Sequence, residues 1–277
     1  MAEEEVTPLT LDGEIVSAAA DQDRDNCDET TTDRLSIPPL EKLKFQPRKK
    51  LLVLGLGGVL THRIFHTETV KIPKSRSPTG RYGNHLVYKR AFCDEFLSFC
   101  FERFELGIWS SATRRNSDSV LDCILRDLRG KLLFLWDEDH CTDSGFKSLE
   151  SKGKALRFKQ LKKLWENLNQ KFPDKLEGYS ASNTLLIDDR PYKALLNPPN
   201  TSIFPELYLA KNVNDKVLDP KGELGLFLEG LAMADDVQSY VRTHAYGQPP
   251  IVPSHPDWFY YSMVVDRISQ RMSSLKI

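Results

Sequence analysis

The sequence has no long hydrophobic run and no regular pattern of paired cysteines. No apolar stretch approaches the roughly 20 residues that a membrane helix needs. The five cysteines are odd in number and lack Cys-x-x-Cys spacing, which excludes an ordinary disulfide framework or zinc site. The N-terminal segment is acidic and resembles neither a secretory signal nor an arginine-rich transit peptide. These absences predict a nuclear or cytoplasmic protein that does not associate with membranes.

Negative charge is concentrated at one end of the chain. Residues 1–45 contain twelve acidic and four basic side chains, a balance of −8, so the remainder carries +7 of the overall charge of −1. Residues 1–46 are rich in Asp, Thr and Ala and lack periodicity, which predicts a disordered acidic tail. The mildly basic remainder is compatible with an anionic partner such as a phosphoprotein or phosphopeptide. We expect no direct binding to nucleic acid.

Beyond the tail, apolar strands alternate with amphipathic helices. We expect strands within 51–60, 105–111, 131–136, 183–191 and 206–210, and helices at 92–104, 114–128, 158–168 and 224–244. Pro, Gly and Ser between residues 61 and 85 indicate a loop or a small hairpin insertion after the first strand. The alternation predicts an α/β domain over 47–250 with a central, mostly parallel sheet covered by helices on both faces. For 251–277 we expect a helical extension.

Three predicted strand ends carry the residues that bear on function, because ligands of such sheets bind at the carboxyl ends of the strands. The first end is Gly55-Leu56-Gly57-Gly58, the second Ser110-Ser111 and the third Asp188-Asp189.

Each end has an ordinary alternative. The glycines could form a nucleotide-binding turn, although VLTHRIF after them does not begin a convincing helix. The two serines could cap the following helix. The aspartates could pair with Arg190, since two carboxylates that end a buried strand are costly without a cation.

Taken in order, these ends resemble the motifs of the haloacid dehalogenase superfamily. More narrowly, they are similar to the small phosphatases that act on the carboxy-terminal domain (CTD) of RNA polymerase II, and most of all to a plant-type branch. The resemblance covers roughly residues 48–245. Its parts are LVYKRAFCDEFLSF (86–99), similar to a helix start with Ala91 in place of a proline; IWSSA (108–112), similar to the second motif; RFKQL (157–161), similar to the third; and LLIDDRP (185–191), similar to the fourth. The resemblance implies a Rossmann-like fold.

The resemblance also implies a role for each strand end. In the family, the first motif is Asp-x-Asp-x-Thr/Val, whose first aspartate attacks phosphorus and binds magnesium and whose second is the acid/base group. Gly55 and Gly57 stand at these two positions, and glycine has no side chain for either task.

Further residues are assigned by the same resemblance. Ser110 and Lys159 become the phosphate-binding candidates, with Lys154 as the alternative to Lys159; on the residues alone, Lys159 is a solvated lysine of an amphipathic helix. Asp188, Asp189 and the backbone carbonyl of Gly57 become the magnesium ligands. This donor set is poor for an ion that prefers an octahedron with carboxylate help, so we expect magnesium binding to be weak or absent.

We therefore expect a catalytically inactive phosphatase-like protein, a pseudophosphatase, that retains binding of a phosphoprotein or another partner. Loss of a covalent nucleophile costs on the order of a million-fold in turnover. Two alternatives stay open. One is an active, magnesium-dependent serine/threonine phosphatase whose two aspartates are altered in this sequence. The other is a non-catalytic scaffold similar to the import-translocase relatives of this fold, although the sequence shows no transit peptide or membrane helix.

Overall fold

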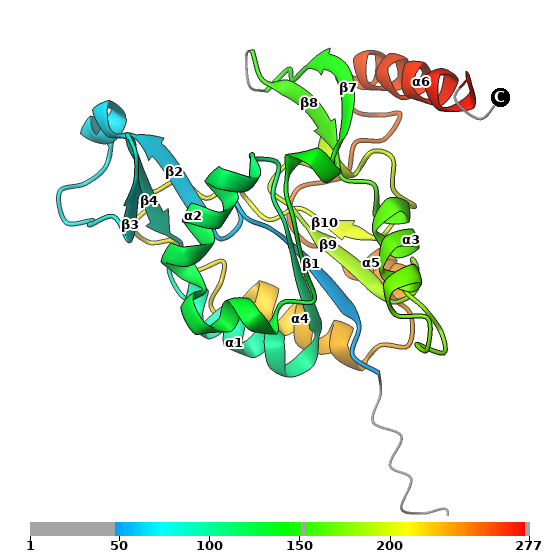
Figure 1. Cartoon of the computed structure of the whole chain (residues 1–277), viewed down its shortest axis with the longest axis horizontal. Coiled ribbons are helices and arrows are strands. Elements are labelled where there is room, and N and C mark those ends of the chain that lie inside the picture. Colours follow the sequence, from blue (N-terminus) through cyan, green and yellow to red (C-terminus); the bar gives the residue numbers. More distant parts are fainter. Residues whose placement is uncertain (1–47, 151–152, 275–277) are drawn as a thin grey trace, which may run out of the picture. The chain divides into compact units, whose positions relative to one another are not determined.

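The centre of the molecule is a parallel sheet with the strand order β10-β9-β1-β5-β6, shown in Figure 1. The computed structural model describes residues 48–150 and 153–274, so the acidic tail predicted over 1–46 lies outside the described residues. The strands of this sheet are β1 (Leu51–Gly55), β5 (Glu105–Trp109), β6 (Phe134–Trp136), β9 (Thr184–Ile187) and β10 (Ser202–Ile203).

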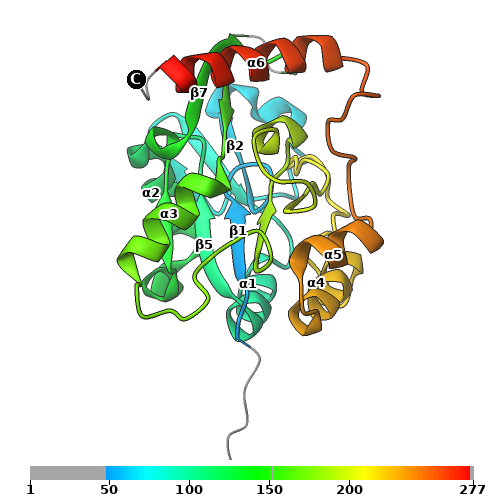
Figure 2. The same ribbon diagram turned by 90° about the vertical axis from the view of Figure 1, so that its right-hand side faces the viewer.

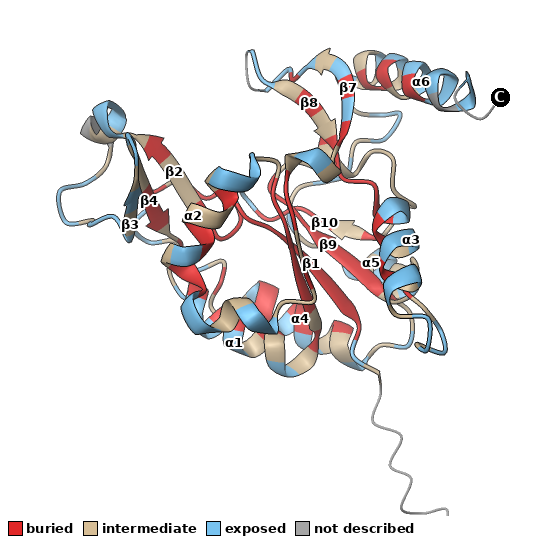
Figure 3. Ribbon diagram, in the orientation of Figure 1, coloured by how far each residue is buried: buried red, intermediate tan, exposed pale blue. Residues whose placement is uncertain are grey.

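β1 is a central strand, because it is hydrogen-bonded along both edges. It pairs with β5, where Leu51 lies opposite Glu105, and with β9, where Leu51 lies opposite Thr184. All of its residues are buried, as Figure 3 shows. A strand that is covered on both faces must be apolar throughout, which explains the uninterrupted run that begins at Leu51.

Helices cover both faces of the sheet, and β1 divides its side chains between them. Leu52 and Leu54 belong to a core with one group of helices, whereas Leu51 and Val53 pack with a single helix on the other face. The first group comprises α1 (Cys93–Arg103), α2 (Arg114–Ile124), α4 (Glu223–Met233) and α5 (Val237–Thr243), and the single helix is α3 (Leu161–Lys171). The predicted α/β fold with helices on both faces is confirmed.

The insertion after β1 is a small antiparallel sheet with the order β2-β4-β3. Its strands are β2 (Thr61–Phe65), β3 (Gly80–Tyr82) and β4 (His85–Lys89). The insertion was predicted to end at residue 85, but β4 continues through residues 86–89, ahead of the helix predicted over 92–104. Tyr88 on β4 is buried against Ile64 of β2 and Ala210, and this packing favours the strand. The helix itself begins at Cys93.

A hairpin of β7 (Thr142–Lys147) and β8 (Ala155–Phe158) precedes α3 and was not predicted. It corrects the predicted helix 158–168, because Phe158 ends β8 and α3 begins only at Leu161. Phe158 is fully buried and packs with Tyr192 and Tyr261. Its pairing with Thr142 of β7 keeps Phe158 in the strand.

Two further predictions on the C-terminal side are wrong. Residues 206–210 form no strand; the backbone N–H of Tyr208 donates to the carbonyl of Gly58 at 2.8 Å, and the outer strand is β10 instead. The predicted helix 224–244 is broken into α4 and α5. The break follows from Asp236, whose side chain caps α5 by accepting a hydrogen bond from the backbone N–H of Ser239 at 2.7 Å.

The last described helix, α6 (Trp258–Ser274), lies beside the β7–β8 hairpin, as Figures 1 and 2 show. Its apolar face consists of buried Tyr261, Val264 and Ile268, which pack on Phe158 and Tyr192. Short 3-10 helices complete the fold: η2 (His66–Lys71), η3 (Arg126–Lys131), η4 (Glu138–His140) and η5 (Pro191–Ala194). Among the described helices, none is both long and apolar enough to span a membrane.

Two aromatic residues on α6 provide a matched test of this packing. We expect Tyr261→Ala to lower the free energy of unfolding by about 3–5 kcal/mol, because a buried aromatic ring leaves a cavity. Phe259→Ala, on the same helix but 84% exposed, should change it by less than about 0.5 kcal/mol. Urea unfolding monitored by circular dichroism measures both values. Equal losses for the two variants would contradict the packing of α6 on this domain.

Candidate functional site

The carboxyl ends of the central strands border a cavity of about 600 Å³. Gly57 and Gly58 follow β1, Ser110 follows β5 and Asp189 follows β9, and all of them line this cavity. The structure therefore brings together the three strand ends that the sequence singled out. Lys159, between β8 and α3, lines it as well.

The three glycines at the end of β1, Gly55, Gly57 and Gly58, have different surroundings. A Cβ atom added at Gly55 would lie 3.2 Å from Oδ2 of Asp188, which is a close contact. At Gly57 an added Cβ would meet no atom within 4 Å. Gly58 has a φ of +83°, and an added Cβ would collide with the carboxylate of Asp189, so this position requires glycine. Of the three positions, only 57 has room for a side chain.

No helix follows these glycines. The backbone N–H of Gly58 donates to the carbonyl of Thr61 at 2.8 Å, and the chain enters β2 at Thr61. A nucleotide-binding turn needs backbone N–H groups that point at phosphate from the start of a helix. The glycine-rich stretch instead carries the chain from β1 into the insertion, so the nucleotide-binding alternative is not supported.

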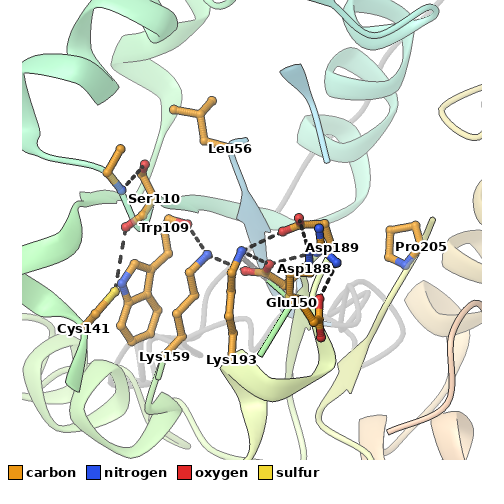
Figure 4. Close-up of polar contacts among 12 residues, drawn as sticks. Leu56, Trp109, Ser110, Cys141, Glu150, Lys159, Asp188, Asp189, Lys193 and Pro205 are labelled. Atoms are coloured by element: carbon orange, nitrogen blue, oxygen red, sulfur yellow. Dashed lines mark hydrogen bonds and ion pairs between the residues drawn. The ribbon is translucent and has the colours of Figure 1, made fainter. Parts of the chain in front are cut away.

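Asp188 is fully buried and contacts two lysines, as Figure 4 shows. Its Oδ2 lies 2.5 Å from Nζ of Lys159, and its Oδ1 lies 2.6 Å from Nζ of Lys193. Lys193 also donates to Oδ1 of Asp189 at 2.6 Å, and Lys159 donates to the carbonyl of Trp109 at 2.5 Å. The other carboxylate oxygen of Asp189, Oδ2, lies 3.4 Å from Nε of Arg190. Both carboxylates that end β9 are thus ion-paired.

Burial and charge act in opposite directions on this cluster. Burial alone would raise the pKa of Asp188, but the ammonium groups of Lys159 and Lys193 outweigh it and hold this pKa well below its ordinary value. Burial raises the pKa of Asp189, and the negative charge of Asp188 adds to the rise although Lys193 opposes it. Burial would lower the pKa of Lys193, but Asp188 and Asp189 raise it. Asp188 and Lys193 are therefore charged at neutral pH.

Backbone hydrogen bonds hold the two lysines next to each other. The N–H of Lys159 donates to the carbonyl of Lys193 at 2.8 Å, which ties the β8–α3 connection to η5. The side chain of Asn197 donates to the carbonyl of Lys159 at 2.9 Å and accepts from the N–H of Leu161 at 2.8 Å. Tyr192, the neighbour of Lys193, is buried against Phe158. The backbone segments that carry the two lysines are therefore fixed relative to each other.

Lys193 was not identified from the sequence. The available signal was its position four residues after Asp189, at which a lysine can turn back to the carboxylate. Lys159 was identified, but on a helix; it lies in the connection before α3. Lys154, the alternative to Lys159, is exposed on the cavity wall, whereas Lys159 is 1% exposed beside Asp188.

The serines after β5 do not cap the next helix. Thr113 is the N-cap of α2, and its side chain accepts a hydrogen bond from the N–H of Asn116. Oγ of Ser110 accepts from the N–H of Ala112 at 3.1 Å, within its own loop. Ser110 is buried in the wall of the cavity. The capping alternative is therefore wrong, and the structure leaves Ser110 beside the cavity.

The residues present do not fit the magnesium ion that the resemblance implies. Both oxygens of Asp188, and Oδ1 of Asp189, already contact ammonium groups. A magnesium ion about 2.1 Å from these oxygens would lie against the same ammonium groups. Two unit charges 4 Å apart repel by about 4 kcal/mol at the effective dielectric of protein sites. In the described part of the chain, no three His, Cys, Asp or Glu side chains are placed to hold a metal.

The wall of the cavity carries more basic than acidic side chains. Arg157 is paired with Glu138, and Arg190 with Glu150. Lys154 is exposed on the wall, and Arg63 of β2 lines it from the insertion. With the two aspartates neutralised by lysines, the cavity suits an anionic ligand rather than a cation.

Comparison with known proteins gives two curated relatives that match part of the chain. The chain is 26% identical over 155 residues to an uncharacterized FCP1 homology domain-containing protein of Schizosaccharomyces pombe, which covers 55% of this chain and 59% of that protein. It is 31% identical over 176 residues to the CTD small phosphatase-like protein 1 of Caenorhabditis elegans, covering 62% of this chain and 30% of that protein. The chain thus spans less than two thirds of the length of either relative.

Two solved structures are also similar. One is described as the structure of Fcp1, an essential RNA polymerase II CTD phosphatase; the identity is 16%, the TM-score is 0.39, and 79% of this chain and 62% of that chain are covered. The other is fission yeast Fcp1 bound to beryllium fluoride, with 17% identity, a TM-score of 0.37 and the same coverage. The family model for NLI interacting factor-like phosphatases matches residues 50–238, more than half of the chain. The chain therefore belongs to the NLI interacting factor-like phosphatase family.

Proposed function

We propose that this chain is a catalytically inactive member of the family, of its plant-type branch, which binds a phosphorylated protein segment without hydrolysing it. The observation that carries this proposal is the absence of a carboxylate from the end of β1. Gly55 and Gly57 stand at the two positions of the first motif, and Gly57 has open space where a reactive side chain would project. A backbone without side chains supplies neither a nucleophile nor an acid/base group.

No described side chain in the cavity wall takes over the missing chemistry. The wall carboxylates are Asp189, which is ion-paired with Lys193, and Glu138, which is ion-paired with Arg157. Asp188 behind them is fully buried between two lysines. A carboxylate in such a pair would have to leave its cation before it attacked phosphorus. Because loss of a nucleophile costs on the order of a million-fold, turnover falls below a useful rate.

Binding can outlast the loss of chemistry, because it depends on charge and shape around the cavity. The basic side chains of Arg63 and Lys154, with Ser110 in the wall, form a surface suited to a phosphate group. The two lysine–aspartate pairs present no excess negative charge to oppose it. The ligand class that we propose is a phosphorylated protein segment in the nucleus or cytoplasm, where the described cysteines, all free, would stay reduced.

Restoration of both aspartates tests the loss of activity. We expect the unmodified chain to show no magnesium-dependent hydrolysis of an artificial aryl phosphate, because it lacks the nucleophile. The Gly55→Asp/Gly57→Asp variant should show detectable hydrolysis, and the matched Gly55→Asn/Gly57→Asn variant should show none. Robust turnover by the unmodified chain would overturn the proposal. Restored activity would also favour the alternative of an active phosphatase altered at these two positions.

The two restorations should differ in their effect on stability. We expect Gly57→Asp to change the free energy of unfolding by less than about 0.5 kcal/mol, because its side chain enters open space. Gly55→Asp should cost about 1–3 kcal/mol without metal, because it places a third carboxylate against Asp188. Urea unfolding in a chelating buffer measures the difference. The same cost at both positions would show that the surroundings of the two glycines do not differ as described.

Phosphate recognition is tested separately by calorimetry. We expect a serine-phosphorylated peptide to bind at low salt more tightly than the same peptide without phosphate, with an affinity that falls as salt is added. Lys154→Ala should weaken the binding of the phosphopeptide by about two- to fivefold, as expected for the loss of an exposed ion pair. Lys216→Ala, which removes an exposed lysine outside the cavity wall, is the control. Absence of binding at low salt to a panel of phosphopeptides would count against retained phosphate recognition.

A further inference from the structure

We propose that the ammonium groups of Lys159 and Lys193 take the place of the divalent cation in this chain, so that the site is complete without a metal and excludes one. The inference rests on the proposed function, because it concerns a site without the two aspartates of the first motif. It goes beyond that function by assigning what neutralises Asp188 and Asp189.

The first support is the occupancy of the carboxylate oxygens. Oδ2 of Asp188 accepts from Lys159, and Oδ1 accepts from Lys193 and from the backbone N–H of Asp189 at 2.8 Å. Oδ1 of Asp189 accepts from the same Lys193 ammonium group. A metal ion bound to these oxygens would lie against the same ammonium groups, so at least one lysine would have to move away for the ion to bind there.

The second support is the balance of charge. Two carboxylates face two ammonium groups, and Gly55 and Gly57 contribute no further negative charge. Aspartates at both glycine positions would add two negative charges, which a divalent cation could balance. With glycine there, an added divalent cation would instead leave two uncompensated positive charges in a buried site.

The third support is that the lysines are held in place. The backbone of Lys159 is hydrogen-bonded to that of Lys193, and Asn197 fixes the connection on the other side. The side chain of Lys159 is 1% exposed and that of Lys193 is 12% exposed. Movement of either ammonium group to solvent would leave the buried Asp188 with one ammonium partner in place of two. Lys159 is accordingly committed to Asp188, and phosphate recognition is left to the outer basic residues.

Removal of one lysine should therefore create a need for metal. We expect the unmodified chain to show the same melting temperature with and without millimolar Mg²⁺, and no saturable binding of Mn²⁺ by electron paramagnetic resonance. Lys193→Met should melt lower by on the order of 10 °C, because a buried pair is broken. Mg²⁺ should recover much of this loss, and Mn²⁺ should bind saturably to one site.

Two controls separate this effect from a general loss of charge. Lys154→Met removes an exposed lysine of the same cavity wall and should create no response to metal. Lys193→Met/Asp189→Asn removes one charge of each sign, leaves Lys159 paired with Asp188, and should melt near the unmodified chain without metal. This double variant and the unmodified chain keep the test decisive if Lys193→Met does not fold.

Saturable one-site binding of Mn²⁺ by the unmodified chain would overturn the inference. It would leave the proposed function intact as long as aryl phosphate is not hydrolysed. Metal-independent folding together with hydrolysis of aryl phosphate would overturn the proposed function and leave the lysine assignment standing. A folded Lys193→Met that gains no response to metal would also overturn the inference.

Discussion

The ion pairs of Asp188 constrain the centre of this molecule. The carboxylate ends a strand that is buried on both faces, and an unpaired charge there would cost several kcal/mol. The compensating charges come from outside the sheet, on the β8–α3 connection and on η5. Those two segments must therefore lie against each other and against the end of β9. The hairpin, the support from Asn197 and the packing of Tyr192 all serve this requirement.

The glycines at the end of β1 differ in how strongly the fold requires them. Gly58 is required by its backbone conformation and by the nearness of Asp189, so this glycine is structural. Gly57 is not required by packing, because a side chain there would meet open space. β1 keeps its hydrogen bonds to β5 and β9 whatever residue occupies that position. The fold alone therefore does not explain why glycine stands at position 57.

Much of the fold followed from local patterns in the sequence, because those patterns report burial directly. The run from Leu51 identified a central strand, and the spacing of Phe96 and Cys100 identified α1. Segments held by distant contacts could not be found in this way. Phe158 looked like the first residue of a helix, yet it pairs with Thr142 of β7 as the end of a strand and is buried in one cluster with Tyr192 and Tyr261.

The same limit applies to the site. The three strand ends were predictable, because the carboxyl ends of parallel strands meet at one edge of a sheet. The role of Lys193 was not, since many lysines four residues from an aspartate are solvated and only the tertiary structure shows which one is buried. Lys159 could be singled out only through the family resemblance, and its pairing with Asp188 is visible only in three dimensions.

Helix α6, at the far end of the described chain, supports the two segments that carry the lysines of the site. Tyr261 of α6 packs on Phe158, the residue before Lys159, and on Tyr192, the residue before Lys193. The segments that carry Lys159 and Lys193 are therefore both packed against α6. A partner protein that bound α6 and displaced it would remove this packing and so change the positions of both lysines. The cavity could in this way be altered from outside, by a contact made on α6.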